Sequence, residues 1–61
     1  MTAEQEVLQI EEADAWMEYL EATRNQTPSR YAEIEPWAWR RLRHRLKGIK
    51  KRRRQLRVAT T

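Results

Sequence analysis

The sequence contains almost no residue that would interrupt an α-helix. Its only glycine and prolines are Gly48, Pro28 and Pro36, and none of them lies within residues 1–24. That N-terminal segment consists of good or ordinary helix formers, so the sequence predicts a long helix over residues 3–24. With 61 residues and no cysteine, the chain has room for one small domain, residues 1–61, without disulfides or thiolate metal sites.

The first predicted helix is followed by a connector over residues 25–35. Within it, Thr27 followed by Pro28 is typical of an N-cap and a first helical position. These two residues predict a short connector helix over residues 28–34.

A second long helix is predicted after the connector. Pro36 disfavours helical geometry in the residue before it, so we expect it to end the connector helix and to begin a helix over residues 36–57. Gly48 inside this helix costs about 1 kcal/mol relative to alanine. Residues 58–61 are expected to fray as a chain terminus.

Each long helix carries a seam with the alternating spacing of three and four residues that is typical of coiled coils. The seam of the first helix comprises Ala3, Glu6, Ile10, Ala13, Met17 and Leu20. The seam of the second comprises Trp39, Leu42, Leu46, Ile49, Arg53 and Leu56. In an antiparallel alignment, the only charged seam residues, Glu6 and Arg53, meet in one layer. We therefore predict an all-α, coiled-coil-like antiparallel two-helix hairpin.

The residues that flank the seams fit the same alignment. It places Glu21 opposite Arg43, and Asp14 opposite Lys50. Exposed ion pairs contribute only about 0–1 kcal/mol each, so we expect them to set the alignment more than the stability.

A second apolar stripe on the first helix is left on the outside by this alignment. It consists of Leu8, Ala15, Tyr19 and Ala22. Two explanations stay open. Either the connector folds over the stripe with Tyr31 and Ile34, or the stripe is a partner surface through which two hairpins form a homodimeric four-helix bundle.

Charge is divided unequally between the two halves of the chain. Residues 1–24 hold seven acidic side chains against Arg24 alone, whereas the remainder holds twelve lysines and arginines against Glu33 and Glu35. Most positions from Arg40 to Arg57 are lysine or arginine, and these cations outnumber the acidic side chains of the first helix. Such asymmetry is typical of halves that pair with each other, of nucleic-acid binders, or of both.

The basic helix is the predicted binding surface. Its outward positions in this alignment are Arg40, Arg41, His44, Lys47, Lys51 and Arg54. A helical row of cations can follow a phosphate backbone, but it does not by itself distinguish RNA from DNA. Two roles stay open for Trp37, which is also outward: it stacks on an unpaired base, or it packs under the connector.

The sequence lacks the residue patterns of an enzyme. His44 is its only histidine, Ser29 has no base near it in sequence, and there is no zinc-ligand spacing or glycine-rich phosphate loop. We expect no metal, cofactor or small-molecule substrate. The absence of a long apolar run and of a cationic signal segment predicts a cytoplasmic protein without a membrane partner. The preference for arginine over lysine suggests a bacterial or phage genome.

Two functions follow from these patterns. The leading hypothesis is a small non-enzymatic regulator that binds nucleic acid, RNA or DNA, or belongs to a nucleoprotein, and contacts phosphates through the basic helix. The alternative is a protein–protein adaptor that docks on a larger machine, such as the transcription or translation apparatus. It would use either the apolar stripe or the basic helix, the latter against an acidic protein surface.

Overall fold

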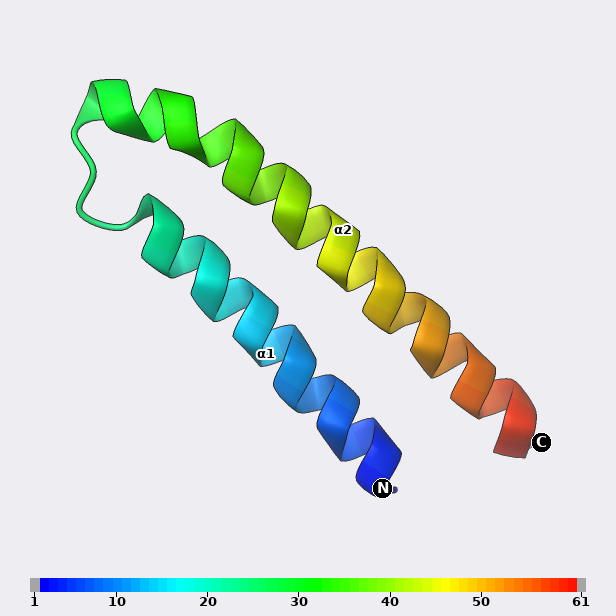
Figure 1. Ribbon diagram of the computed structural model, residues 1–61. Helices are drawn as coiled ribbons and strands as arrows, with labels where there is room; N and C mark the ends of the chain where they lie inside the picture. Colours follow the sequence, from blue (N-terminus) through cyan, green and yellow to red (C-terminus); the bar gives the residue numbers. More distant parts are fainter. Residues whose placement is uncertain (1, 61) are drawn as a thin grey trace.

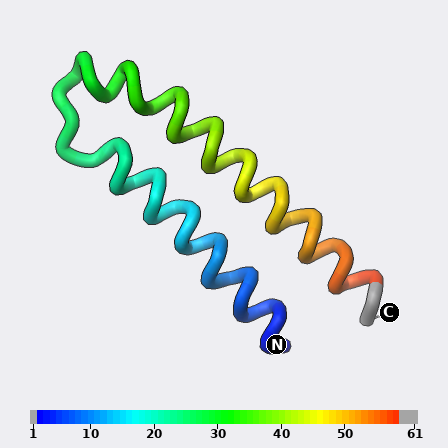
Figure 2. Tube along the Cα trace, in the orientation of Figure 1, coloured from blue at the N-terminus to red at the C-terminus, as the bar shows by residue number. Residues whose placement is uncertain are grey.

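The protein folds as two antiparallel helices that lie side by side (Figures 1 and 2). The computed structural model describes the backbone of residues 2–60 and the side chains of residues 2–58. Helix α1 spans Ala3–Thr23 and helix α2 spans Pro28–Thr60, and the described residues contain no strand. The molecule is elongated, with its Cα atoms extending over 49 × 16 × 7 Å. The predicted all-α helical hairpin is confirmed.

Helix α1 is defined at both ends by local contacts. At its start, the Gln5 backbone N–H donates a hydrogen bond to Thr2 Oγ1 over 3.2 Å, and the Thr2 N–H donates to Gln5 Oε1 over 3.0 Å. This reciprocal capping box satisfies backbone donors that have no partner inside the helix. At its end, Arg24 is extended and Asn25 has a φ of 55°, a left-handed conformation that asparagine tolerates better than most residues. The chain therefore turns directly after Thr23.

Helix α2 begins where the Thr27–Pro28 pair predicts, because Thr27 caps it. The Arg30 backbone N–H donates to Thr27 Oγ1 over 3.3 Å, and the Tyr31 N–H donates to the Thr27 carbonyl over 2.8 Å. The connector is therefore residues 24–27 and not 25–35. The segment expected to form a separate short helix, residues 28–34, is the first part of α2.

The predicted helix boundary at Pro36 is wrong, because α2 continues through it. A proline inside a helix removes one backbone hydrogen bond and crowds the preceding turn, and bending relieves the crowding. The ribbon of α2 is bent in this part of the helix (Figure 1). Tyr19 also holds Glu35, the residue before the proline, against α1 through a hydrogen bond. Helix α2 extends to Thr60, beyond its predicted end at residue 57, and Thr61, the last residue of the expected frayed tail, lies outside the described residues.

The contact between the helices has a small apolar core. Its buried side chains in the described part of the chain are Leu8, Ala15, Ala38, Leu42 and Ile49. Leu42 and Ile49 confirm part of the predicted seam of the second helix. On α1, however, the residues that face α2 belong to the stripe that was expected to lie outside.

The predicted orientation of α1 is therefore wrong by about half a turn. Ile10 and Met17, expected in the core, are 66% and 54% exposed, whereas Leu8 and Ala15 are 2% and 1% exposed. The stripe that faces α2 is flanked by carboxylates of α1 that form four ion pairs with arginines of α2, and Tyr19 of this stripe donates a hydrogen bond to Glu35. Those carboxylates belong to Glu11, Glu12 and Glu18.

Several predicted contacts are replaced as a consequence. Arg53 pairs with Glu12 and not with Glu6. The expected pairs of Glu21 with Arg43 and of Asp14 with Lys50 do not form, and those side chains are exposed. The stripe of Leu8, Ala15, Tyr19 and Ala22 packs against α2 within the chain, so it does not form the outward dimer surface that the sequence suggested.

Candidate nucleic-acid interface

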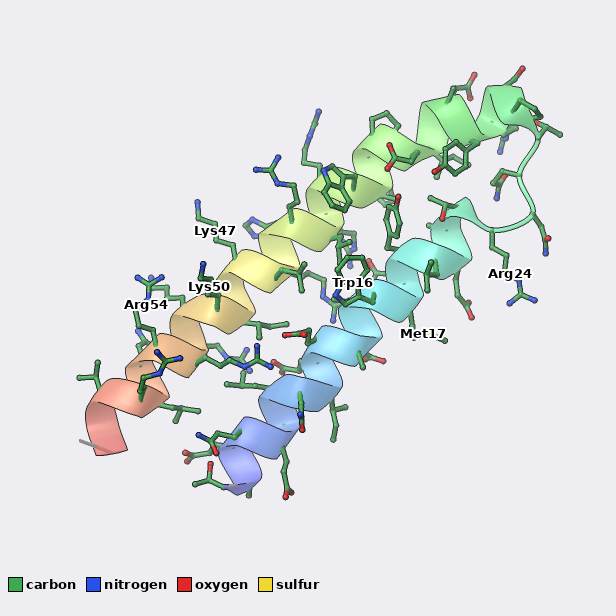
Figure 3. The ribbon with its side chains drawn as sticks, turned by 180° about the vertical axis from the view of Figure 1, so that it is seen from behind. Trp16, Met17, Arg24, Lys47, Lys50 and Arg54 are labelled. Atoms are coloured by element: carbon green, nitrogen blue, oxygen red, sulfur yellow. The ribbon has the colours of Figure 1, made fainter. Side chains whose placement is uncertain are left out.

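One side of α2 is covered with basic side chains that α1 does not reach. We call it the basic face and define it by Arg40, Arg43, His44, Lys47, Lys50, Lys51 and Arg54. All seven side chains are exposed, and none forms a hydrogen bond or ion pair within the described residues. Figure 3 shows Lys47, Lys50 and Arg54 projecting from the side of α2 that is turned away from α1.

The basic face contains a regular row of cations. Its members are Arg40, Arg43, Lys47, Lys50 and Arg54, which alternate in spacing between three and four residues. This spacing keeps side chains on one face of a helix. At a rise of about 1.5 Å per residue, the row extends over roughly 21 Å.

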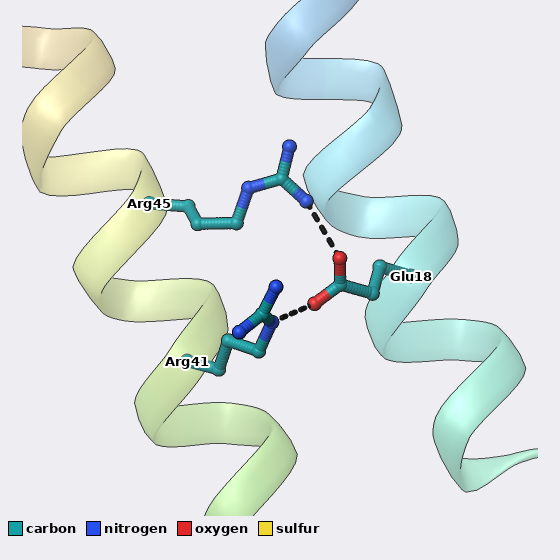
Figure 4. A network of polar contacts seen from close by, with 3 residues as sticks. All are labelled: Glu18, Arg41 and Arg45. Atoms are coloured by element: carbon teal, nitrogen blue, oxygen red, sulfur yellow. Dashed lines mark hydrogen bonds and ion pairs between the residues drawn. The ribbon is translucent and has the colours of Figure 1, made fainter.

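Four other arginines of α2 form ion pairs with three carboxylates of α1. Glu18 accepts hydrogen bonds from Arg41 Nε and from Arg45 Nη1, the latter over 2.9 Å (Figure 4). Arg52 pairs with Glu11, and Arg53 Nη1 donates to Glu12 Oε2 over 2.7 Å. Arg41, predicted to lie on the binding surface, is thus engaged with α1. The ion pairs flank the helix contact and leave the basic face to solvent.

The paired carboxylate of Glu18 prefers its charged form. Hydrogen bonding to Arg41 holds the pKa of Glu18 below its ordinary value of 4.5, and the nearby charge of Arg45 adds to the effect. The same contact raises the pKa of Arg41. Both side chains are ionised near neutral pH, but the single Glu18 carboxylate is shared by Arg41 and Arg45 and therefore compensates the two arginines only in part.

Tyr19 joins the two helices near the connector. Its hydroxyl donates a hydrogen bond of 2.7 Å to Glu35 Oε2, and this bond, with desolvation, raises the pKa of Tyr19 to about 12. The Tyr19 ring contacts Trp39 and Trp16 edge to face, with centroid separations of 5.9 and 6.4 Å. Such aromatic pairs add stability beyond the area they bury. Tyr19, expected to face a partner, is therefore part of the hairpin contact.

Trp39 is the aromatic residue that the structure brings into the basic face. It lines a shallow depression together with Glu35, Pro36, Arg40, Arg43, His44 and Lys47. The Trp39 side chain is 41% exposed, so part of its ring surface is open to solvent. Sequence reasoning assigned Trp39 to the seam and missed it here. The available signal was its spacing of four residues from both Arg43 and Glu35, which places all three along one side of the helix.

Trp37 lies elsewhere. It is 60% exposed and lines a groove with Glu18, Arg41 and the aromatic ring of Tyr19. It therefore does not pack under a connector helix, and the cation that lines the same groove, Arg41, is already paired with Glu18. Among the predicted site residues, Arg40, His44, Lys47, Lys51 and Arg54 share one exposed face, whereas Arg41 and Trp37 lie on its flank. Arg43 and Lys50, assigned by the sequence to the seam flank, belong to the face.

Two other kinds of site are absent from the described residues. No group of three or more histidine, aspartate and glutamate side chains is placed to hold a metal ion. Neither α1 nor α2, as far as the structure describes them, has an apolar stretch long enough to cross a membrane.

Comparisons with protein-family models, with curated proteins and with solved structures find no match to this chain.

Proposed function

We propose that this protein binds nucleic acid by contacting its phosphate backbone with the basic face of α2. One observation carries the proposal. The basic face holds six exposed lysines and arginines with no acidic partner in the described chain, although four other arginines of the same helix are paired with α1. Unpaired cations concentrated on one side of a rigid helix are well suited to a polyanion.

In this proposal α1 acts as a scaffold. Its carboxylates occupy the arginines at the sides of the helix contact and orient α2, so that anions can approach only from the outer side. A duplex carries about one phosphate charge per 1.7 Å of its axis, so a row of roughly 21 Å can engage several phosphates. Guanidinium groups bind phosphate oxygens through two parallel hydrogen bonds, which suits Arg40, Arg43 and Arg54.

The depression at Trp39 favours single strands over duplex. A base that is not paired can stack on the exposed part of the Trp39 ring while its neighbouring phosphates meet Arg43 and Lys47. Bases in a duplex are already stacked and cannot reach the ring. Unpaired regions of RNA, such as loops, are the commonest targets of this type of recognition.

The test is fluorescence anisotropy with a labelled single-stranded RNA and a labelled duplex DNA, titrated over a range of salt concentrations. We expect binding that persists near 0.15 M salt, is tighter for the single strand, and has a salt dependence equivalent to about four to six phosphate contacts. The triple variant Lys47→Glu, Lys51→Glu, Arg54→Glu should lose this binding and keep its helicity.

A matched pair of single variants separates site binding from general basicity. Lys51→Glu and Arg30→Glu change the net charge equally, and both side chains are exposed, but only Lys51 lies on the basic face. We expect a clear loss of affinity for Lys51→Glu and little for Arg30→Glu. Equal losses, or undiminished binding by the triple variant, would contradict the proposal.

A protein partner is the remaining outcome. If binding to both nucleic acids disappears at physiological salt, the nucleic-acid proposal fails and an adaptor function gains support. Because Leu8 and Ala15 are covered by α2, such an adaptor could not use the stripe that contains them.

A further inference from the structure

The side of α1 opposite α2 carries a second set of regularly spaced apolar residues. We call it the outer face of α1 and define it by Ala3, Glu6, Ile10, Ala13, Met17 and Leu20. All six side chains are exposed. Met17 is about two and a half turns from the buried Leu8, which places it on the opposite side of the helix. Figure 3 shows Met17, and Arg24 just beyond the helix, both pointing away from α2.

We propose that the outer face of α1 binds the same face of a second copy of this chain, with the two α1 helices antiparallel. With the two-fold axis crossing the outer face at the level of residue 15, Ile10 lies opposite Leu20 of the second copy, and Ala13 lies opposite its Met17. The spacing of three and four residues is that of a coiled-coil seam, and placing a small side chain opposite a large one lets the layers interdigitate.

Charge complementarity within the same register points to a second copy. It places Glu6 opposite Arg24 of the second copy, so the one acidic residue of the seam meets the only lysine or arginine of the N-terminal segment 1–24. Neither side chain forms an ion pair within the described chain. They are separated by about 27 Å along the helix, so they cannot reach each other in one molecule. Two-fold symmetry forms the pair twice.

Two residues flank this seam near the axis. On one flank, opposite Trp16 of the second copy, lies Trp16, whose ring packs edge to face against Tyr19 of its own chain and stays 41% exposed. On the other flank Asp14 approaches Asp14 of the second copy, and like charges at such positions are destabilising. The like-charge contact of Asp14 is specific to this register, so its effect on the affinity of the dimer can be measured.

The proposed dimer is weak and leaves the basic face uncovered. A single seam between two short helices is at the lower end of specific interface sizes, so we expect the dimer to dissociate on dilution. Since α2 lies on the far side of α1 from the seam, the two basic faces lie on opposite outer edges of the dimer. The inference therefore does not depend on nucleic-acid binding.

Sedimentation of the full chain over a wide concentration range tests the proposal. We expect the mass to rise from 7.5 kDa towards twice that value as concentration increases. Ile10→Glu and Leu20→Glu should each keep the protein monomeric with unchanged helicity, because both side chains are exposed in the single chain. Trp37→Glu, which changes an exposed apolar residue of α2, should dimerise normally. A wild-type protein that stays monomeric at every concentration would overturn the proposal and leave this face for a different protein.

A charge swap tests the register. Glu6→Arg and Arg24→Glu should each weaken the dimer, and the double variant should restore it, because the inverted pair re-forms between copies. Asp14→Asn should tighten the dimer about two- to fivefold by removing a like-charge contact. A double variant that dimerises no better than either single variant would contradict the antiparallel seam, even if nucleic-acid binding is established.

Discussion

The inner and outer faces of α1 differ in both composition and use. The inner face, which contacts α2, contributes one large aliphatic side chain, Leu8, and the small Ala15, and it is flanked by glutamates. The outer face contributes Ile10, Met17 and Leu20, all exposed in the single chain. The face with more large aliphatic side chains is thus not the one that packs against α2. In a hairpin with so small a core, the content of large aliphatic side chains therefore does not by itself decide which of two apolar faces is buried; the buried face is the one that also forms ion pairs and the Tyr19 contacts.

The largest expected effect comes from shortening one aliphatic side chain on each face. Leu8→Ala removes buried methyl groups and should lower the free energy of unfolding by about 2–3 kcal/mol. Ile10→Ala, measured at a concentration where the chain is monomeric, should change it by less than about 0.5 kcal/mol. Urea denaturation followed by circular dichroism measures both. Equal losses would remove the distinction between the two faces.

On α2, two tryptophans allow the same comparison for ligand binding. Trp39→Ala removes the ring from the depression in the basic face and should weaken single-stranded RNA binding by about tenfold, since stacking one base contributes about 1–3 kcal/mol. Trp37→Ala removes a more exposed ring beside the Glu18–Arg41 ion pair and should have little effect. Anisotropy titrations measure the RNA affinity of both variants, and circular dichroism confirms that they fold. A greater loss for Trp37→Ala would place the stacking site on the flank.

An alkaline titration examines the inner face through Tyr19. Its pKa is raised from 10.0 to about 12, chiefly by the hydrogen bond to Glu35, so the folded state favours the protonated phenol. The corresponding stability is present below pH 10 and should be lost as the pH rises through about 12. Thermal unfolding at several pH values should show this loss in the wild type and a smaller one in Tyr19→Phe. Parallel curves for the two proteins would rule out the contribution of Tyr19.

The smallest expected effect concerns one ion pair of the inner face. Glu18→Gln removes the acceptor shared by Arg41 and Arg45 and should slightly lower Tm at low salt. Glu21→Gln, at an exposed position without an ion pair in the described chain, should leave Tm unchanged. High salt should abolish the difference, because about 1 M salt reduces the screening length to roughly 3 Å.

Lowering the pH should also remove the stabilising effect of the Glu18 carboxylate. The pKa of its carboxyl is lowered in the folded state, chiefly by the hydrogen bond from Arg41, so its stabilising effect is present above pH 4.5 and lost as the pH falls through the lowered value. The wild type and Glu18→Gln should therefore converge in Tm at low pH. A gap between them that persists in strong acid would contradict an ionic origin.

The hairpin could be predicted from the sequence because helix breakers are rare and both helices have coiled-coil spacing. The rotation of α1 could not, because Leu8 and Ala15 follow the same spacing as Ile10 and Met17. Both faces have carboxylates beside them that could meet cations of α2, and long side chains make it hard to judge from spacing which of these pairs form. Continuity through Pro36 was missed because the tertiary contacts beside it outweigh the local preference of proline.

The candidate site was predicted in outline from the concentration of cations in α2. Lys47 and Lys51 lie on the exposed face as expected. Arg43 and Lys50 were missed, and Arg41 was wrongly included, because each assignment depended on the rotation of α1. Because the sequence placed the other face of α1 against α2, it assigned Arg43 and Lys50 to ion pairs that do not form and left Arg41 unpaired.

The orientation of α1 determines both which cations of α2 remain unpaired and which residues form the outer face of α1. Nuclear Overhauser effects between side chains, measured at a concentration where the chain is monomeric, test it most directly. We expect cross-peaks from the Leu8 methyl groups to α2, including Leu56, which lines the same groove, and none from Ile10 to α2. Cross-peaks from Ile10 to Ile49, with none from Leu8 to α2, would show that α1 packs through its other face and would contradict the account.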